Sequence, residues 1–132
     1  GHTMDLLLVE DNYASVITAV RGNCDAEVVQ MLLKFSCMDD FKEITDNSKR
    51  LFLSHGHLFD PVLFSHYQAD IYFSGHTHIH TACINRDGVY TLNPGSISLP
   101  KGNTNPSFGI YDSKYFSVHH LENGEEILHI DF

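Results

Sequence analysis

The sequence predicts an α/β fold in which two β-sheets pack face to face with flanking helices. Three observations support this prediction: apolar runs that end at turns, an apolar spacing of helical type after the first run, and alternating strands toward the C-terminus. Strand–helix units come first and antiparallel hairpins last. That order is typical of two packed sheets with helices outside them.

The first half of the chain is predicted to contain a short helix at residues 5–13 and a buried strand at residues 15–20, which are rich in β-branched side chains. Asp25 can cap the helix that follows, because Val28, Val29, Leu32 and Leu33 recur at helical spacing up to about Phe35. Strands are expected at residues 41–45 and 50–54, around a polar turn.

The second half is predicted to begin with a short helix at residues 61–68, since Pro61 suits a first turn. A buried strand follows at residues 69–74. Residues 82–85 and 89–92 flank Asp87-Gly88, which favours a tight hairpin. The alternating tail predicts three more strands, at residues 108–111, 115–121 and 127–130.

Length and charge limit the function classes. The 132 residues suit one domain, and we take residues 1–4 as a tag remnant and residues 5–132 as the domain. The formal charge of −9, without a basic run, argues against nucleic-acid and membrane partners. No apolar stretch approaches the roughly 18 residues that a membrane span needs. Three cysteines without a paired motif predict no disulfide framework and favour a cytoplasmic location.

Three turns carry side chains that could bind a metal, and each follows an apolar run. The turns are Gly22-Asn23-Cys24-Asp25, His55-Gly56-His57 and Gly75-His76-Thr77-His78. Ligand sites of open α/β sheets lie beyond the carboxyl ends of the strands, where all three turns are expected. Neutral imidazole suits Zn, Mn, Fe, Co or Ni. Metal chemistry is therefore the leading hypothesis.

Each candidate also has a structural interpretation. His55 is the favoured ligand of its pair because it follows the strand directly, whereas structural and functional roles are equally weighted for His57. Asp25 is favoured as a helix cap. Cys24 could be a soft ligand or a proton donor, although free cysteines are more often simply buried. Asn93-Pro94-Gly95-Ser96 is a turn that could orient an anion, but alone it indicates little.

Together the motifs resemble those of the calcineurin-like metallophosphoesterases, and most of all a small bacterial and archaeal phosphodiesterase branch. The matching segments are Arg21-Gly22-Asn23-Cys24-Asp25, Ser54-His55-Gly56-His57, Gly75-His76-Thr77-His78 and Asn93-Pro94-Gly95-Ser96. The resemblance implies that Asn23, His55 and His76 hold one metal of a two-metal centre and that His78 holds the other.

The resemblance also implies an activity: hydrolysis of a small phosphorylated substrate, by in-line attack of a metal-bound hydroxide in a site with two divalent ions. Manganese is the expected metal, and zinc, iron, cobalt or nickel would also suit. Residues that bind the substrate are not assigned.

Two departures from the family pattern matter. The family begins with strands ending in Asp-x-His and Gly-Asp, and neither motif precedes Gly22. Because those carboxylates balance the metal charge, we expect the chain to bind one ion or none, to be inactive or weakly active, and to self-associate through an exposed sheet edge. Cys24 stands where many relatives have a histidine, which favours diesters with good leaving groups.

A non-catalytic alternative is a protein-interaction scaffold, because the eukaryotic retromer subunit has the same fold and binds protein partners. Retention of Asn23, His55, His76 and His78 together favours a shortened enzyme over a scaffold. A misassigned start is a third, simpler hypothesis.

Overall fold

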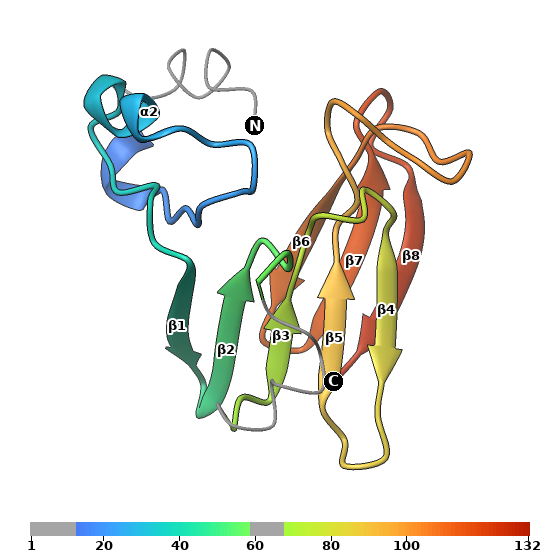
Figure 1. Ribbon diagram of the computed structural model, residues 1–132. Coiled ribbons are helices and arrows are strands. Elements are labelled where there is room, and N and C mark those ends of the chain that lie inside the picture. The colour runs from blue at the N-terminus through green and yellow to red at the C-terminus, as the bar shows by residue number, and fades with distance from the viewer. Residues whose placement is uncertain (1–12, 59–67) are drawn as a thin grey trace.

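A computed structural model describes residues 13–58 and 68–132 (Figure 1). The elements, in order, are η1 (Ala14–Val16), α2 (Glu27–Leu32), β1 (Phe41–Asp46), β2 (Lys49–Ser54), β3 (Ile71–Phe73), β4 (Thr81–Ile84), β5 (Tyr90–Asn93), β6 (Ser107–Asp112), β7 (Tyr115–His120) and β8 (Glu126–Asp131). The helices predicted at residues 5–13 and 61–68, and the tag boundary, fall wholly or almost wholly outside the described residues.

The strands form two sheets, which confirms the predicted fold class. The larger sheet has the order β1-β2-β3-β5-β4 and the smaller has the order β6-β7-β8. Strands β2, β3 and β5 run parallel, while β1 and β4 are antiparallel to their neighbours. The smaller sheet is antiparallel throughout and lies behind β3, β4 and β5 in Figure 1.

The core lies between the two sheets. Leu51, Ile71 and Leu92 of the larger sheet pack with Phe116 and Val118 of the smaller one, and all five are buried. Burying this apolar surface is the main force that holds the sheets together. These contacts leave the ends of β2, β3 and β5 fixed relative to one another.

Two polar contacts also join the sheets near the outer strand β1. The hydroxyl of Tyr111 donates a hydrogen bond to Asp46 Oδ2 at 3.0 Å. Lys49 Nζ donates to the carbonyl oxygen of Ser113 at 2.6 Å. Both contacts bridge residues more than 60 positions apart in the chain, so they stabilise tertiary rather than local structure.

Two predicted hairpins are confirmed. Asn47 and Ser48 both have positive φ, as a two-residue turn between paired residues requires, and they connect β1 to β2. Between β4 and β5, Asn85 Oδ1 accepts hydrogen bonds from the backbone N–H groups of Asp87 and Val89, both at 2.9 Å. This side chain fixes the turn that the sequence indicated.

The strand predicted at residues 15–20 is wrong. Residues 14–16 form the 3-10 turn η1, and residues 17–20 belong to no sheet of the described part. Instead, Ile17 and Ala19 pack on a small cluster formed by Leu33, Phe35 and Cys37. A preference of β-branched residues for strands is mainly a preference for packing on a sheet, and here no neighbouring strand of the described part pairs with the segment.

Asp25 is not the cap of the following helix, so that prediction is also wrong. The residue before α2 is Ala26, which makes no side-chain cap hydrogen bond. Asp25 Oδ2 instead accepts a hydrogen bond from the N–H of Gly22 at 2.8 Å and closes the turn that carries Asn23. The helix ends at Leu32, and its apolar side chains Val28 and Met31 are exposed.

Candidate metal centre

The candidate site lies at the carboxyl ends of two parallel strands. His55 follows β2 directly, and residues 74–78 follow β3. The backbone N–H of Gly75 donates to the carbonyl oxygen of His55 at 2.9 Å, which joins the two turns. Asn23 reaches the same place from the turn before α2.

Three of the four predicted ligands meet. His55 Nε2 lies 3.0 Å from Asn23 Oδ1 and 3.3 Å from His76 Nδ1. Donors held about 2.1 Å from one ion at angles of about 90–105° are separated by about 3.0–3.3 Å. The separations of 3.0 and 3.3 Å therefore fit three ligands of one transition-metal ion.

A bound cation explains the closeness of these three atoms better than hydrogen bonds between them do. An imidazole nitrogen carries either one proton or one in-plane lone pair, and His55 Nε2 faces two partner atoms. If it donates to Asn23, it has nothing left to offer His76. A cation between the three atoms would satisfy all of them at once.

Electrostatics favour the ligating form of His55. Burial lowers the pKa of this imidazole, and the neighbouring His57 and His76 lower it further, while Asp25 opposes them. The neutral ring, which has the lone pair that a metal needs, is thus favoured. A Cβ added at Gly22 would lie 3.0 Å from Asp25 Oδ2 and 3.4 Å from His55 Nδ1, so a larger residue there would crowd this turn.

The turn after β3 has a strained backbone. His76 and His78 have φ of 63° and 61°, in the left-handed region that disfavours residues with a Cβ. Such conformations cluster at functional sites, where the surrounding structure holds them. The strain marks the segment that carries two of the predicted ligands.

His78 does not join the other three ligands. Its Nδ1 lies 2.6 Å from the carbonyl oxygen of Leu99, so Nδ1 donates a hydrogen bond there and Nε2 is the ring nitrogen left for another contact. The ring is still near enough for its charge to lower the pKa of His55. The structure thus brings together the three ligands predicted for one ion and leaves His78 apart from them.

The two weaker candidates are at the rim of the site. The ring of His57 is 5.2 Å from that of His55 and 6.2 Å from that of His76, between centroids, and its buried Nδ1 has no hydrogen-bond partner in the described part. Cys24 is exposed, so it is not the buried thiol that its residue type would suggest, whereas Cys37 is. All three cysteines of the chain are free.

Carboxylates do not complete the site within the described part of the chain. Over residues 13–58 and 68–132, no group of three or more His, Cys, Asp or Glu side chains is suited to hold a metal ion. Asn23, His55 and His76 form a group of three possible ligands only when the amide oxygen of Asn23 is counted. The carboxylates that the resemblance implies are not among these residues.

Asn93 was not among the predicted site residues. Only 4 % of this residue is exposed, and its Nδ2 donates to the carbonyl oxygen of Gly75 at 2.8 Å and to Thr77 Oγ1 at 3.1 Å. The Asn-Pro-Gly motif indicated a turn and drew attention to its backbone. Its position at the end of a strand beside the two histidine-bearing turns could have identified the side chain.

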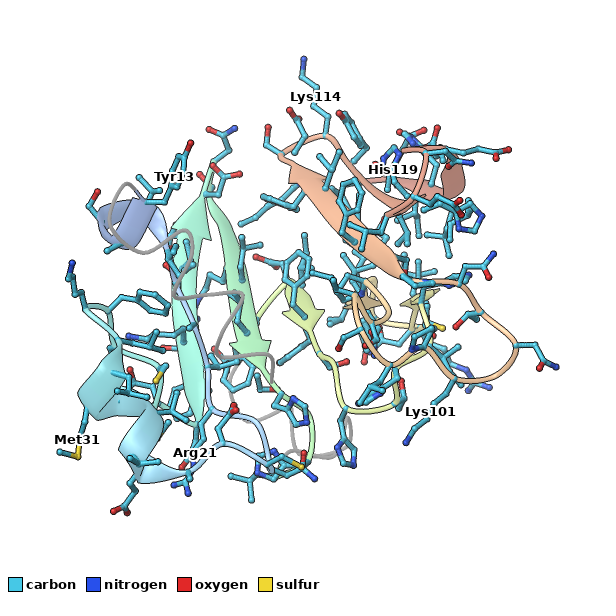
Figure 2. All side chains as sticks on the ribbon, turned by 90° about the horizontal axis from the view of Figure 1, so that it is seen from above. Tyr13, Arg21, Met31, Lys101, Lys114 and His119 are labelled. Atoms are coloured by element: carbon cyan, nitrogen blue, oxygen red, sulfur yellow. The ribbon has the colours of Figure 1, made fainter. Side chains whose placement is uncertain are left out.

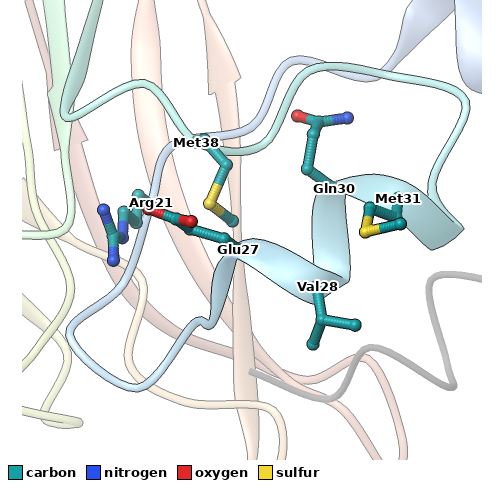
Figure 3. A pocket seen from close by; sticks show the side chains of 6 residues that line it. All are labelled: Arg21, Glu27, Val28, Gln30, Met31 and Met38. Atoms are coloured by element: carbon teal, nitrogen blue, oxygen red, sulfur yellow. The ribbon is translucent and has the colours of Figure 1, made fainter.

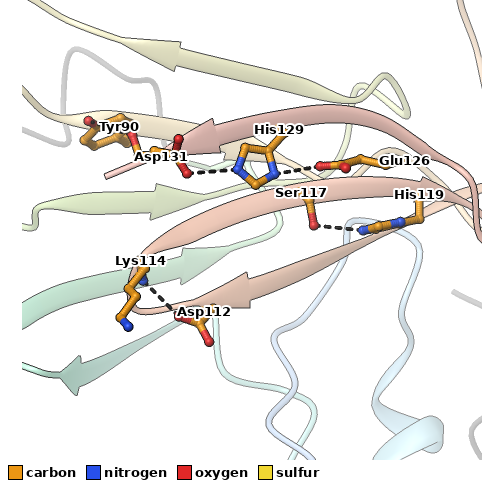
Figure 4. A network of polar contacts seen from close by, with 8 residues as sticks. All are labelled: Tyr90, Asp112, Lys114, Ser117, His119, Glu126, His129 and Asp131. Carbon is orange, nitrogen blue, oxygen red and sulfur yellow. Dashed lines mark hydrogen bonds and ion pairs between the residues drawn. The ribbon is translucent and has the colours of Figure 1, made fainter.

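Other polar groups lie elsewhere. His129 of β8 bridges Glu126 and Asp131, and His119 pairs with Ser117, all on the smaller sheet (Figure 4). In the view from above, His119 and Lys114 lie opposite Arg21 and Lys101 (Figure 2). The turn of Asn23 follows Arg21, so His119 lies on the other side of the molecule from that turn in this view.

A cavity lies between α2 and the segment that leads to β1. Its lining residues are Arg21, Glu27, Val28, Gln30, Met31 and Met38 (Figure 3). The predicted ligands do not line it. Over the described residues, no helix is both long and apolar enough to cross a membrane.

Comparisons with known proteins agree with the motifs. Residues 4–115 match the calcineurin-like phosphoesterase superfamily domain. The chain is 44% identical over 106 residues to the phosphodiesterase YfcE of Escherichia coli, covering 80% of this chain and 57% of that protein. It is 32% identical over 102 residues to the probable metallophosphoesterase YsnB of Bacillus subtilis, covering 69% of this chain and 53% of that protein.

Solved structures support the same relationship. The phosphoesterase Yfce from E. coli superposes with a TM-score of 0.83 and 35% identity, over 96% of this chain and 70% of that one. Vps29 from Entamoeba histolytica complexed with Zn²⁺ has a TM-score of 0.54 at 23% identity, over 95% of this chain and 88% of that one, which shows the fold alone. The chain spans a little over half of the length of the curated relatives that it matches. The chain belongs to the calcineurin-like phosphoesterase family.

Proposed function

We propose that the chain carries part of the site of a metal-dependent phosphodiesterase. Asn23, His55 and His76 would hold one divalent transition-metal ion, with manganese expected, and His78 would serve a second. The observation that carries this proposal is the contact of Asn23 Oδ1 and His76 Nδ1 with the same atom, His55 Nε2. Family membership supplies the reaction class.

The roles of the residues follow from their atoms. Asn23 offers an amide oxygen, and His55 and His76 offer imidazole nitrogens on a turn held by the ends of β2 and β3. His78, protonated at Nδ1, keeps Nε2 for coordination. When bound, divalent ions would neutralise the phosphoryl oxygens and activate water for in-line attack on phosphorus.

The substrate class proposed is a small phosphodiester with a good leaving group. Cys24 is exposed beside the ligand Asn23, and a thiol is a poorer proton donor than imidazolium for an alkoxide leaving group. His57, whose ring lies beside those of His55 and His76, is proposed to contact the substrate. Both roles are secondary to metal binding.

Metal binding is the direct test. We expect Co²⁺ added to the purified chain to give the visible absorption of a nitrogen- and oxygen-ligated ion. The affinity should fall in His55→Ala or Asn23→Ala by at least roughly 10–100-fold, the loss seen when only a partner that orients a ligand is removed. His129→Gln is the matched control, because that histidine is on β8 and contacts Glu126 and Asp131. Equal binding by all variants would refute the proposed ligands.

Activity is tested with bis-para-nitrophenyl phosphate and added Mn²⁺. We propose that this chain alone turns the diester over weakly, because the described residues offer no carboxylate cluster to balance two dications. A version that also carries strands ending in the family's Asp-x-His and Gly-Asp motifs should be much faster. Comparable turnover by the two would show that those carboxylates are not needed.

A scaffold function is the alternative. The likeness to Vps29 supports only the fold, because identity is 23%. The metal titration separates the hypotheses, since a scaffold needs no ion and would tolerate His55→Ala in binding its partner. Convergence of the three predicted ligands favours the enzyme.

We also propose that the chain self-associates in solution and resides in the cytoplasm. The outer strand β1 exposes 38 % of Phe41 and 38 % of Ile44, and α2 exposes 85 % of Met31. Exposed apolar side chains along a sheet edge favour pairing with a second chain. No nucleic-acid partner is proposed, because the net charge is −9.

A further inference from the structure

Asn93 uses both ends of its buried amide at the candidate metal centre. Its Nδ2 donates to the carbonyl oxygen of Gly75 at 2.8 Å and to Thr77 Oγ1 at 3.1 Å, and its Oδ1 accepts from the N–H of Gly95 at 2.9 Å. We propose that Asn93 is a positioning residue that holds the turn of residues 75–78 in its metal-ligating conformation. This inference rests on the proposed function.

The two hydrogen bonds from Asn93 Nδ2 hold the chain on both sides of His76, one of the proposed ligands. One reaches the residue before His76 and the other reaches the residue after it. His76 and His78 are both left-handed, a conformation that costs about 1–2 kcal/mol for a residue with a Cβ. Without ties on both sides the turn would relax, and the nitrogen of His76 would move away from His55.

Asn93 is itself anchored to the core. It ends β5 directly after Leu92, which is fully buried between the sheets. Beyond it, the carbonyl oxygen of Pro94 accepts a hydrogen bond from Ser107 Oγ at 2.8 Å, which ties the turn to the start of β6. The amide therefore transmits the fixed position of the sheet to a turn that lacks regular structure.

Only a donor at the Nδ2 position makes these contacts. In Asn93→Asp an oxygen would face the carbonyl oxygen of Gly75, so one bond becomes a repulsion while Oδ1 can still accept from Gly95. We expect Co²⁺ affinity to fall by roughly 10–100-fold, the range seen when a partner that orients a metal ligand is removed. Asn85→Asp is the matched control, because Asn85 accepts two backbone N–H bonds through Oδ1, which aspartate retains.

Variants of Thr77 give a second test of the inference if Asn93→Asp does not fold. Thr77→Val keeps the shape of the side chain and removes the acceptor of one bond, so Co²⁺ affinity should drop by a smaller factor. Thr77→Ser keeps the hydroxyl and should restore the affinity of the native chain. Equal affinity of the valine and serine variants would contradict a role for this bond.

A readout without metal separates this inference from the proposed function. In the metal-free chain, amide hydrogen exchange at residues 75–78 should be faster in Asn93→Asp than in the native chain and in Asn85→Asp. If the native chain binds no Co²⁺, the proposed function fails, while exchange still tests the hold of Asn93 on the turn. Unchanged exchange at residues 75–78 would overturn the inference, as would unchanged metal affinity in a native-like Asn93→Asp.

Discussion

Single residues at the candidate site were predictable when their chemistry is ligand-like and their place follows a strand. His55, His76 and Asn23 meet those conditions, and the structure brings them together. Asn93 also ends a strand, but two of its three hydrogen bonds reach Gly75 and Thr77, which only the folded chain brings near. Asp25 was predicted to cap a helix because of its residue type, but its carboxylate accepts a hydrogen bond from the N–H of Gly22, earlier in the chain.

Gly95 allows a prediction at this scale. Gly88 and Gly95 both have positive φ, at +79° and +86°, but an added Cβ meets nothing at Gly88 and would lie 2.1 Å from Ser107 Oγ at Gly95. We expect Gly88→Ala to lower the free energy of unfolding by about 1 kcal/mol and Gly95→Ala by about 2–4 kcal/mol. Urea unfolding measures both. Equal losses would show that the Ser107 hydroxyl moves aside freely.

At the scale of elements, hairpins were predicted better than isolated segments. Asp87-Gly88 indicated its turn because the required conformations are local. Residues 15–20 have a strand-like composition, but a strand also needs a partner, and Ile17 packs on Leu33, Phe35 and Cys37 instead. Helix α2 ends at Leu32, before the predicted end near Phe35, and Val28 and Met31 are exposed although their spacing suits a buried face.

The contact between β6 and β1 gives a pH-dependent prediction. Burial and the Asp46 carboxylate raise the pKa of Tyr111 to about 12. A folded-state pKa above the ordinary value of about 10 means that folding favours the protonated phenol. The stability gained from it is complete below about pH 10 and is lost as the pH rises to about 12.

Thermal unfolding of Tyr111→Phe tests this at several pH values. The free energy of unfolding of the variant should be lower by about 1 kcal/mol at neutral pH. Between about pH 10 and 12 it should depend less on pH than that of the native chain. Tyr115→Phe is the control, because Tyr115 stacks on His129 on the smaller sheet. If native chain and Tyr111→Phe lose stability in parallel, the Asp46 contact is not the cause.

At the scale of the whole molecule, the two-sheet architecture followed from the order of the elements, and the packed core confirms it. Which surfaces stay exposed did not follow, because exposure depends on contacts between distant segments. The outer strand β1 and the apolar face of α2 are both exposed over the described residues. The proposed self-association concerns these two surfaces.

Sedimentation velocity of two variants distinguishes the surfaces. Ile44→Lys places a charge on the outer strand and should shift the chain toward monomer if the strand edge mediates association. Met31→Glu should do so if the helix face is responsible. A native chain that is monomeric at high concentration would rule out self-association.

The left-handed backbone at His76 and His78 has an evolutionary consequence. Glycine adopts that conformation without a steric penalty, so the folding requirement alone would replace both histidines. Selection for heat resistance alone would therefore replace His76 and His78 by glycine at an early stage. In a screen of random variants, gains in melting temperature at these two positions would accompany loss of the proposed metal binding.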